Sequence, residues 1–89
     1  MLAQVTVSGR VQGVGFRYSA QQQAKNYQLT GWVQNKADGT VELEVEGDEQ
    51  RVHAYLRALE KGFSPFIRVE NMEVNLNENE KGYDDFSIK

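Results

Sequence analysis

The chain has 89 residues, the length of one small domain, and its 39% hydrophobic and 26% charged residues are typical of a soluble globular protein. The net charge of −3 argues against non-specific nucleic-acid binding, and the lack of cysteine excludes disulfides, thiolate zinc sites and a cysteine nucleophile. We recognise no signal peptide and no apolar run of the ~18 residues that span a bilayer, so we expect a cytoplasmic protein with no membrane contact.

A strand, a loop and a helix are predicted at the start of the chain. Leu2 to Ser8 alternates apolar and polar residues, as a half-buried strand does. A glycine-rich loop follows, from Gly9 to Phe16. Arg17 to Gln28 contains no proline or glycine, and its apolar residues recur at near-helical spacing, which predicts an amphipathic helix.

Two strands joined by a hairpin turn are predicted next. Thr30 to Lys36 forms the first of them, and Ala37 to Gly39 supplies residues typical of a turn. In Thr40 to Glu46, apolar residues alternate with glutamates, which predicts one buried side and one side in contact with water. We therefore expect exposed side chains at Glu42, Glu44 and Glu46.

The last part of the chain predicts a helix and two strands. Asp48 is expected to cap the helix, which stops near Gly62. The strand that follows shifts its alternation, and this predicts a bulge or kink near Asn71. A polar loop then leads to a short edge strand at Phe86 to Ile88.

The order β-α-β-β-α-β with a small extra strand predicts an α+β fold of the ferredoxin-like type. Two right-handed crossovers would put both helices on one face of an antiparallel sheet. We recognise no repeat, linker or composition change, so residues 1–89 are expected to form a single domain.

The strongest functional signal is the stretch from Gly9 to Arg17, which reads GRVQGVGFR. Its three glycines allow positive φ and can gather N–H groups into an anion nest, to which the following helix adds the positive end of its dipole. Arg17 stands where the loop becomes the helix, and its planar fork of donors matches two phosphate oxygens. The glycines alone would also fit an ordinary turn beside a surface arginine.

Asn35 is the second candidate, because a β-α-β unit brings the end of its second strand near the Gly9 to Arg17 loop. Its carboxamide both donates and accepts, so it can orient a water molecule without deprotonating it. An asparagine at a strand end is by itself more often structural. His53 is expected on the outer side of its helix, and no catalytic triad or metal site has convincing spacing.

Gly9 to Arg17 resembles the phosphate-binding signature of the acylphosphatase family. Gly31 to Val41, which reads GWVQNKADGTV, resembles the other signature of that family. The chain length, the order of the two blocks and the Phe86 to Ile88 ending are also similar, so the resemblance covers essentially the whole chain. It implies an enzyme that hydrolyses acyl phosphates to a carboxylate and inorganic phosphate, without metal or cofactor.

The resemblance also implies roles for individual residues. The arginine at the Arg17 position binds the substrate phosphate, and the asparagine at the Asn35 position places the nucleophilic water. The phosphate cradle is completed by the backbone amides of Gln12, Gly13, Val14, Gly15, Phe16 and Arg17. An acyl phosphate has a good leaving group, so positioning and charge stabilisation are the main tasks. With no base nearby, the proton of the water is expected to pass to a substrate phosphate oxygen.

The expected partners are a small acyl phosphate as substrate and inorganic phosphate as product and competitive ligand. We expect the protein to be a monomer that binds no nucleic acid. The acyl group could be acetyl, carbamoyl, aminoacyl or glycolytic.

Two alternatives to this enzymatic function remain. One is a non-catalytic anion-binding module, like the acylphosphatase-like domains of larger maturation enzymes that handle carbamoyl phosphate. The other is an RNA-binding module, which needs stacking aromatics and basic residues where this chain has glutamates.

Overall fold

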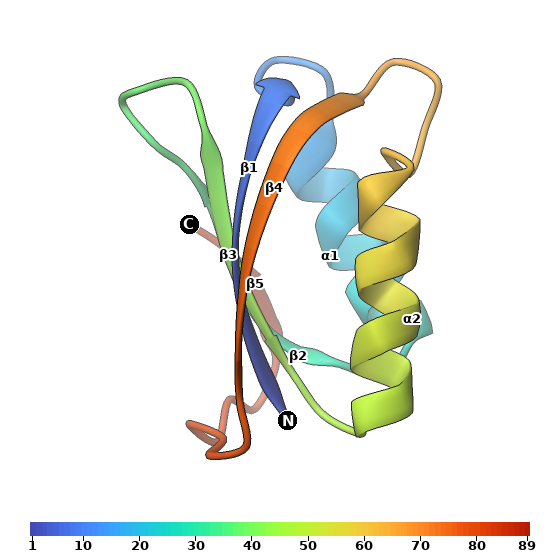
Figure 1. Cartoon of the computed structure of the whole chain (residues 1–89), viewed down its shortest axis with the longest axis vertical. Coiled ribbons are helices and arrows are strands. Elements are labelled where there is room, and N and C mark those ends of the chain that lie inside the picture. The colour runs from blue at the N-terminus through green and yellow to red at the C-terminus, as the bar shows by residue number, and fades with distance from the viewer.

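The computed structural model describes residues 1–89 and arranges them in two layers, a sheet and a pair of helices (Figure 1). The strands are β1 Leu2–Arg10, β2 Thr30–Asn35, β3 Val41–Glu46, β4 Arg68–Asn77 and β5 Phe86–Ile88, and the helices are α1 Phe16–Asn26 and α2 Glu49–Glu60. Both helices cover the same face of the sheet (Figure 1). The element order and the layers confirm the ferredoxin-like α+β fold.

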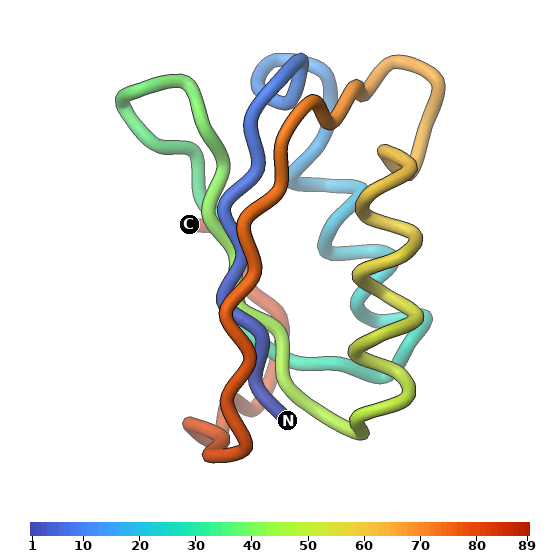
Figure 2. Tube along the Cα trace, in the orientation of Figure 1, coloured from blue at the N-terminus to red at the C-terminus, as the bar shows by residue number.

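The sheet has the strand order β4-β1-β3-β2-β5. The four long strands pair antiparallel, and β1 and β4 lie side by side along their whole length (Figure 2). The short β5 pairs with β2 in parallel, with Phe86 opposite Gly31 and Ile88 opposite Val33. The expected edge strand is therefore present, and its parallel direction carries the end of the chain toward the same end of the sheet as Asn35.

The hydrophobic core lies between the sheet and the helices and contains 18 buried residues. The alanines of α1 face this core, where they let the helix lie close to the sheet. The hydroxyl of Tyr55 donates to the main-chain oxygen of Ala20 over 2.9 Å and so joins α2 to α1, and burial raises the pKa of this tyrosine. Phe16, the first residue of α1, is 1% exposed and packs on Phe63, so the start of the helix is fixed in the core.

Two local features expected from the sequence are present in the structure. Asp48 caps α2 by accepting a hydrogen bond from the Arg51 N–H over 3.3 Å, as predicted. The predicted irregularity near Asn71 is also present. Ser8 lies opposite Asn71 while Gly9 lies opposite Val69, so one residue of β4 bulges between them.

Neither helix combines the length and the hydropathy that a membrane-spanning helix requires.

The β1 end and the loop after it differ from the expectation. The strand continues through Gly9 to Arg10, so the loop covers only residues 11–15, and α1 begins at Phe16 and ends at Asn26. Gly9 has φ +126°, and a side chain there would collide with the main chain of β4. Its glycine therefore serves the bulged strand pair and not the loop. β2 likewise ends at Asn35 and not at Lys36.

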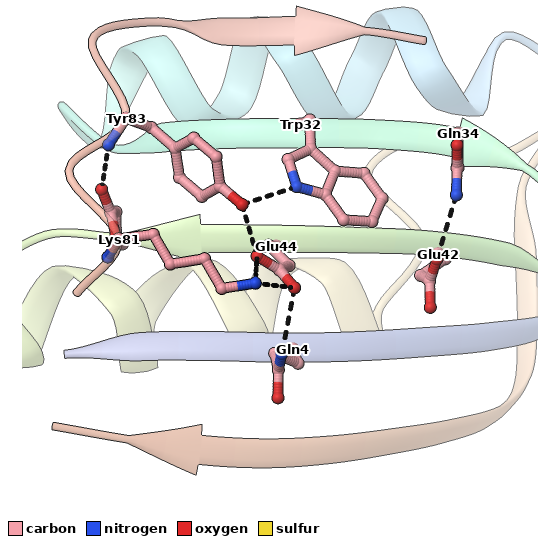
Figure 3. Close-up of polar contacts among 8 residues, drawn as sticks. Gln4, Trp32, Gln34, Glu42, Glu44, Lys81 and Tyr83 are labelled. Atoms are coloured by element: carbon pink, nitrogen blue, oxygen red, sulfur yellow. Dashed lines mark hydrogen bonds and ion pairs between the residues drawn. The ribbon is translucent and has the colours of Figure 1, made fainter. Parts of the chain in front are cut away.

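The expectation that all three β3 glutamates meet water is wrong. Glu44 is 6% exposed and Glu46 is 3% exposed, because the loop between β4 and β5 crosses this face of the sheet. The main-chain N–H groups of Lys81 and Tyr83 both donate to the Glu46 carboxylate. Glu42 alone is half-buried, and the Gln34 side chain donates to it over 3.0 Å (Figure 3).

The Glu44 carboxylate is the centre of a polar cluster on this face (Figure 3). It accepts from the Tyr83 hydroxyl over 2.6 Å, from Gln4 over 3.0 Å and from the Lys81 ammonium over 3.1 Å. Burial raises the pKa of Glu44, but these three hydrogen bonds outweigh it, and the pKa lies below its usual value. The carboxylate is thus charged at neutral pH and fully paired, which is why a buried acid is tolerated here.

Candidate active site

The loop at residues 11–15 joins β1 to α1 at the end of the sheet that also carries the β2–β3 hairpin (Figure 1). Gly13 and Gly15 have φ of +75° and +79°, and open space surrounds both positions. Glycine is required there for its backbone conformation and not for close packing. Gly15 is the N-cap of α1 and has no side chain to accept from the first turn, so the N–H groups of that turn have no side-chain cap.

The first turn of α1 has an unusual charge for a helix start. It contains no acidic residue, although acids are favoured there by the helix dipole, and it contains Arg17 instead. The uncapped N–H groups, the positive dipole end and the guanidinium therefore act in the same place. This arrangement favours an anion at the start of α1.

A pocket of about 260 Å³ opens at this point. Arg17 from α1 and Asn35 from the end of β2 both line it, so the two candidates that lie 18 positions apart in the sequence share one pocket. Arg17 is the only charged side chain of the lining. The lining residues are Val11, Gly13, Gly15, Phe16, Arg17, Tyr18, Asn35 and Ile88. Of the six residues expected in the phosphate cradle, Gln12 and Val14 are outside this lining.

Arg17 is half-buried, and its Nη1 donates to the main-chain oxygen of Lys89 over 3.3 Å. Lys89 in turn donates its N–H to the Val33 oxygen of β2 over 2.8 Å. The guanidinium is therefore oriented by the strand pair that carries Asn35. A guanidinium has five N–H donors, and this single bond leaves the others for a ligand.

Asn35 is the last residue of β2 and lies opposite Val41 of β3. Its side chain is exposed and has no hydrogen-bond partner within the protein. Both its donor and its acceptor are therefore free to hold a water molecule or a ligand at the pocket.

The side chain of Gln12 has a role that sequence reasoning missed. Its Nε2 donates to the main-chain oxygens of Lys36 and Thr40, each over 2.8 Å. These oxygens flank the turn of the β2–β3 hairpin, and Lys36 follows Asn35 directly. Gln12 thus ties the loop to the hairpin and fixes the position of Asn35 relative to the start of α1. Its partners lie 24 and 28 residues away, so no local spacing pointed to it.

His53 lies outside this pocket. Its side chain is 41% exposed on α2, with Nε2 4.0 Å from Glu49 of the same helix. The expected surface position is confirmed.

Comparison with known proteins finds similarity along the whole chain. The family model described as Acylphosphatase matches residues 3–88. An acylphosphatase of Bacillus licheniformis is 46% identical over 94% of this chain and 92% of its own length. The crystal structure of acylphosphatase from Bacillus subtilis is 42% identical, covers 100% of this chain and 99% of its own, and has a TM-score of 0.94. Full-length HypF in a phosphate- and nucleotide-bound form is 31% identical with a TM-score of 0.84, but this chain covers only 11% of it.

Proposed function

Because this chain belongs to the acylphosphatase family and hydrolyses acyl phosphates, we propose that Arg17 and the loop before it hold the phosphate while Asn35 places the attacking water. The observation that carries the proposal is that both side chains line one pocket together with the loop glycines. The backbone amides of residues 12–17 are the proposed cradle, with Gln12 and Val14 contributing through the main chain only.

The phosphate end of the substrate is the dianionic part of the molecule, and it matches the positive start of α1. The guanidinium of Arg17 spans two of its oxygens, and the free N–H groups of the loop and first turn approach the others. In the transition state the negative charge is spread over the equatorial oxygens and the oxygen that leaves, so donors fixed around these positions stabilise that state more than they stabilise the substrate.

The carboxamide of Asn35 holds a water molecule in line with the bond that breaks. The water oxygen bonds to phosphorus as the bond from phosphorus to the acyl oxygen breaks, and the acyl group leaves as a carboxylate. The pocket lining contains no carboxylate and no imidazole, so the proton of the water passes to a phosphate oxygen of the substrate. The other product is inorganic phosphate.

The alternatives to an enzyme have less support. The B. licheniformis acylphosphatase is matched over more than nine-tenths of both chains, whereas HypF is matched over 11% of its length. An RNA-binding face would need free aromatic rings on the open side of the sheet. Trp32 and Tyr83 lie on that side, but the Trp32 indole N–H donates to the Tyr83 hydroxyl, and that hydroxyl donates to the buried Glu44 (Figure 3).

We further propose that the reaction needs no metal. Residues 1–89 are proposed to form one domain, which acts as a monomer in the cytoplasm. Only four large hydrophobic side chains are exposed, and two of these line the pocket, which leaves little apolar surface for self-association.

Phosphate release from benzoyl phosphate in the presence of excess chelator tests the metal-free reaction. We expect undiminished turnover and competitive inhibition by inorganic phosphate. Turnover that stops with chelator and returns with added metal would contradict the metal-free mechanism.

Light scattering of the purified protein tests the proposed monomeric state. Fractionation of cells tests the proposed cytoplasmic location.

Replacing Gln12 with alanine should lower kcat/KM by about 10- to 100-fold, because the loop and Asn35 would no longer be held at a fixed separation. The loss of two hydrogen bonds should also cost about 1–2 kcal/mol of unfolding free energy. Steady-state kinetics and urea denaturation measure the two effects.

Gln4→Ala is the matched control, because the Gln4 side chain hydrogen-bonds to Glu44 on the far side of the sheet from the helices. It should destabilise the protein without lowering kcat/KM. If Gln12→Ala loses stability but keeps full activity, Gln12 does not position the site.

A further inference from the structure

Large hydrophobic side chains are exposed at only four positions of the chain: Tyr18, Phe66, Leu76 and Ile88, at 65%, 74%, 48% and 42%. Tyr18 and Ile88 both line the pocket that contains Arg17 and Asn35. Exposed apolar residues scattered singly need no explanation, but two of them in one concave site beside polar groups are typical of a ligand pocket.

Both side chains are held by regular structure. Tyr18 follows Arg17 directly in the first turn of α1, and Ile88 lies on β5, paired with Val33 of β2. The bond from Arg17 to the main-chain oxygen of Lys89 joins the two elements. A helix and a strand position side chains more accurately than loops do, so this apolar part of the pocket is preorganised next to the phosphate site.

The lining offers no second charge for a charged acyl group. Arg17 is its only charged side chain, and the proposed function uses it for the phosphate. The ammonium of Lys89, the residue next to Ile88, lies over the Trp32 ring at 4.2 Å from its centre. A charged acyl substituent would lose water here without gaining a partner of opposite charge of its own, whereas an apolar one would gain by burial.

We propose that this enzyme favours acyl phosphates with an apolar acyl group, and that Tyr18 and Ile88 are the side chains that contact it. The inference rests on the proposed function, because it takes the phosphate end to be held by Arg17 and the loop. The whole pocket has about 260 Å³, slightly below the roughly 300–1,000 Å³ usual for drug-sized ligands, and the phosphate end shares this volume, so the acyl group is a small one.

The test compares kcat/KM for benzoyl phosphate with kcat/KM for acetyl phosphate, which share the phosphate end and differ in the acyl group. In Tyr18→Ala and in Ile88→Ala, the ratio of the two values should fall by about 10-fold, the lower end of what one apolar contact contributes to specificity. The inhibition constant of inorganic phosphate should stay at its wild-type value in both variants, because phosphate does not reach the apolar part of the pocket.

Phe66→Ala and Leu76→Ala are the matched controls, since they also remove exposed hydrophobic side chains but lie outside the pocket. They should leave the ratio unchanged. A ratio that stays constant in both pocket variants, or equal losses on both substrates, would overturn the inference while leaving the proposed function in place. If inorganic phosphate fails to compete with benzoyl phosphate in the wild type, the proposed function itself fails, and the inference with it.

Discussion

Replacing Asn35 with alanine is expected to lower kcat by on the order of 10²–10³ while the affinity for inorganic phosphate stays unchanged. The reason is that the proposed role of the carboxamide is to contact the attacking water and not the phosphate. Its side chain has no partner within the protein, so its removal leaves no unpaired group behind. The measurement is kcat with benzoyl phosphate together with the inhibition constant of inorganic phosphate.

The Asn75→Ala variant is the control for this experiment, because Asn75 is an exposed asparagine on β4 that does not line the pocket. It should keep full activity. If phosphate affinity collapses in Asn35→Ala, then Asn35 shapes the phosphate site instead of placing water.

The Arg17→Lys variant should show a higher KM and a lower kcat, with kcat/KM reduced by on the order of 10²–10³. Lysine keeps the positive charge but loses the planar fork that is proposed to span two phosphate oxygens. Because the charge is kept, a loss of this size would assign the effect to geometry. Initial rates over a range of benzoyl phosphate concentrations separate the two constants.

Arg57→Lys makes the same exchange on the exposed side of α2, away from the pocket, and should change neither constant. Turnover near the wild-type rate in Arg17→Lys would rule out the two-pronged contact with the phosphate.

The features that could be predicted from the sequence depend on neighbours in the chain. The Asp48 cap bonds to a residue three positions away, and the bulge near Asn71 is visible as a shift in the β4 alternation. The nearness of Arg17 and Asn35 followed from topology, because a β-α-β unit brings the loop and the end of the second strand to the same end of the sheet.

The features that were missed depend on contacts between distant segments. The β3 alternation was read correctly, yet Glu44 is buried because Tyr83 reaches it from a loop 39 residues away. Gly9 was assigned to the loop because a glycine that relieves a close strand contact looks the same in sequence as a glycine that makes a turn. The position of Ile88 at the pocket also depends on a long-range contact, because it results from the parallel pairing of β5 with β2.

Titration with inorganic phosphate, followed by the backbone amide chemical shifts of residues 12–17, tests the phosphate cradle most directly. The account predicts saturable shifts of these amides in the wild type and in Asn35→Ala, and much weaker binding in Arg17→Lys. Shifts that cluster elsewhere on the protein, or binding that survives in Arg17→Lys and disappears in Asn35→Ala, would contradict it.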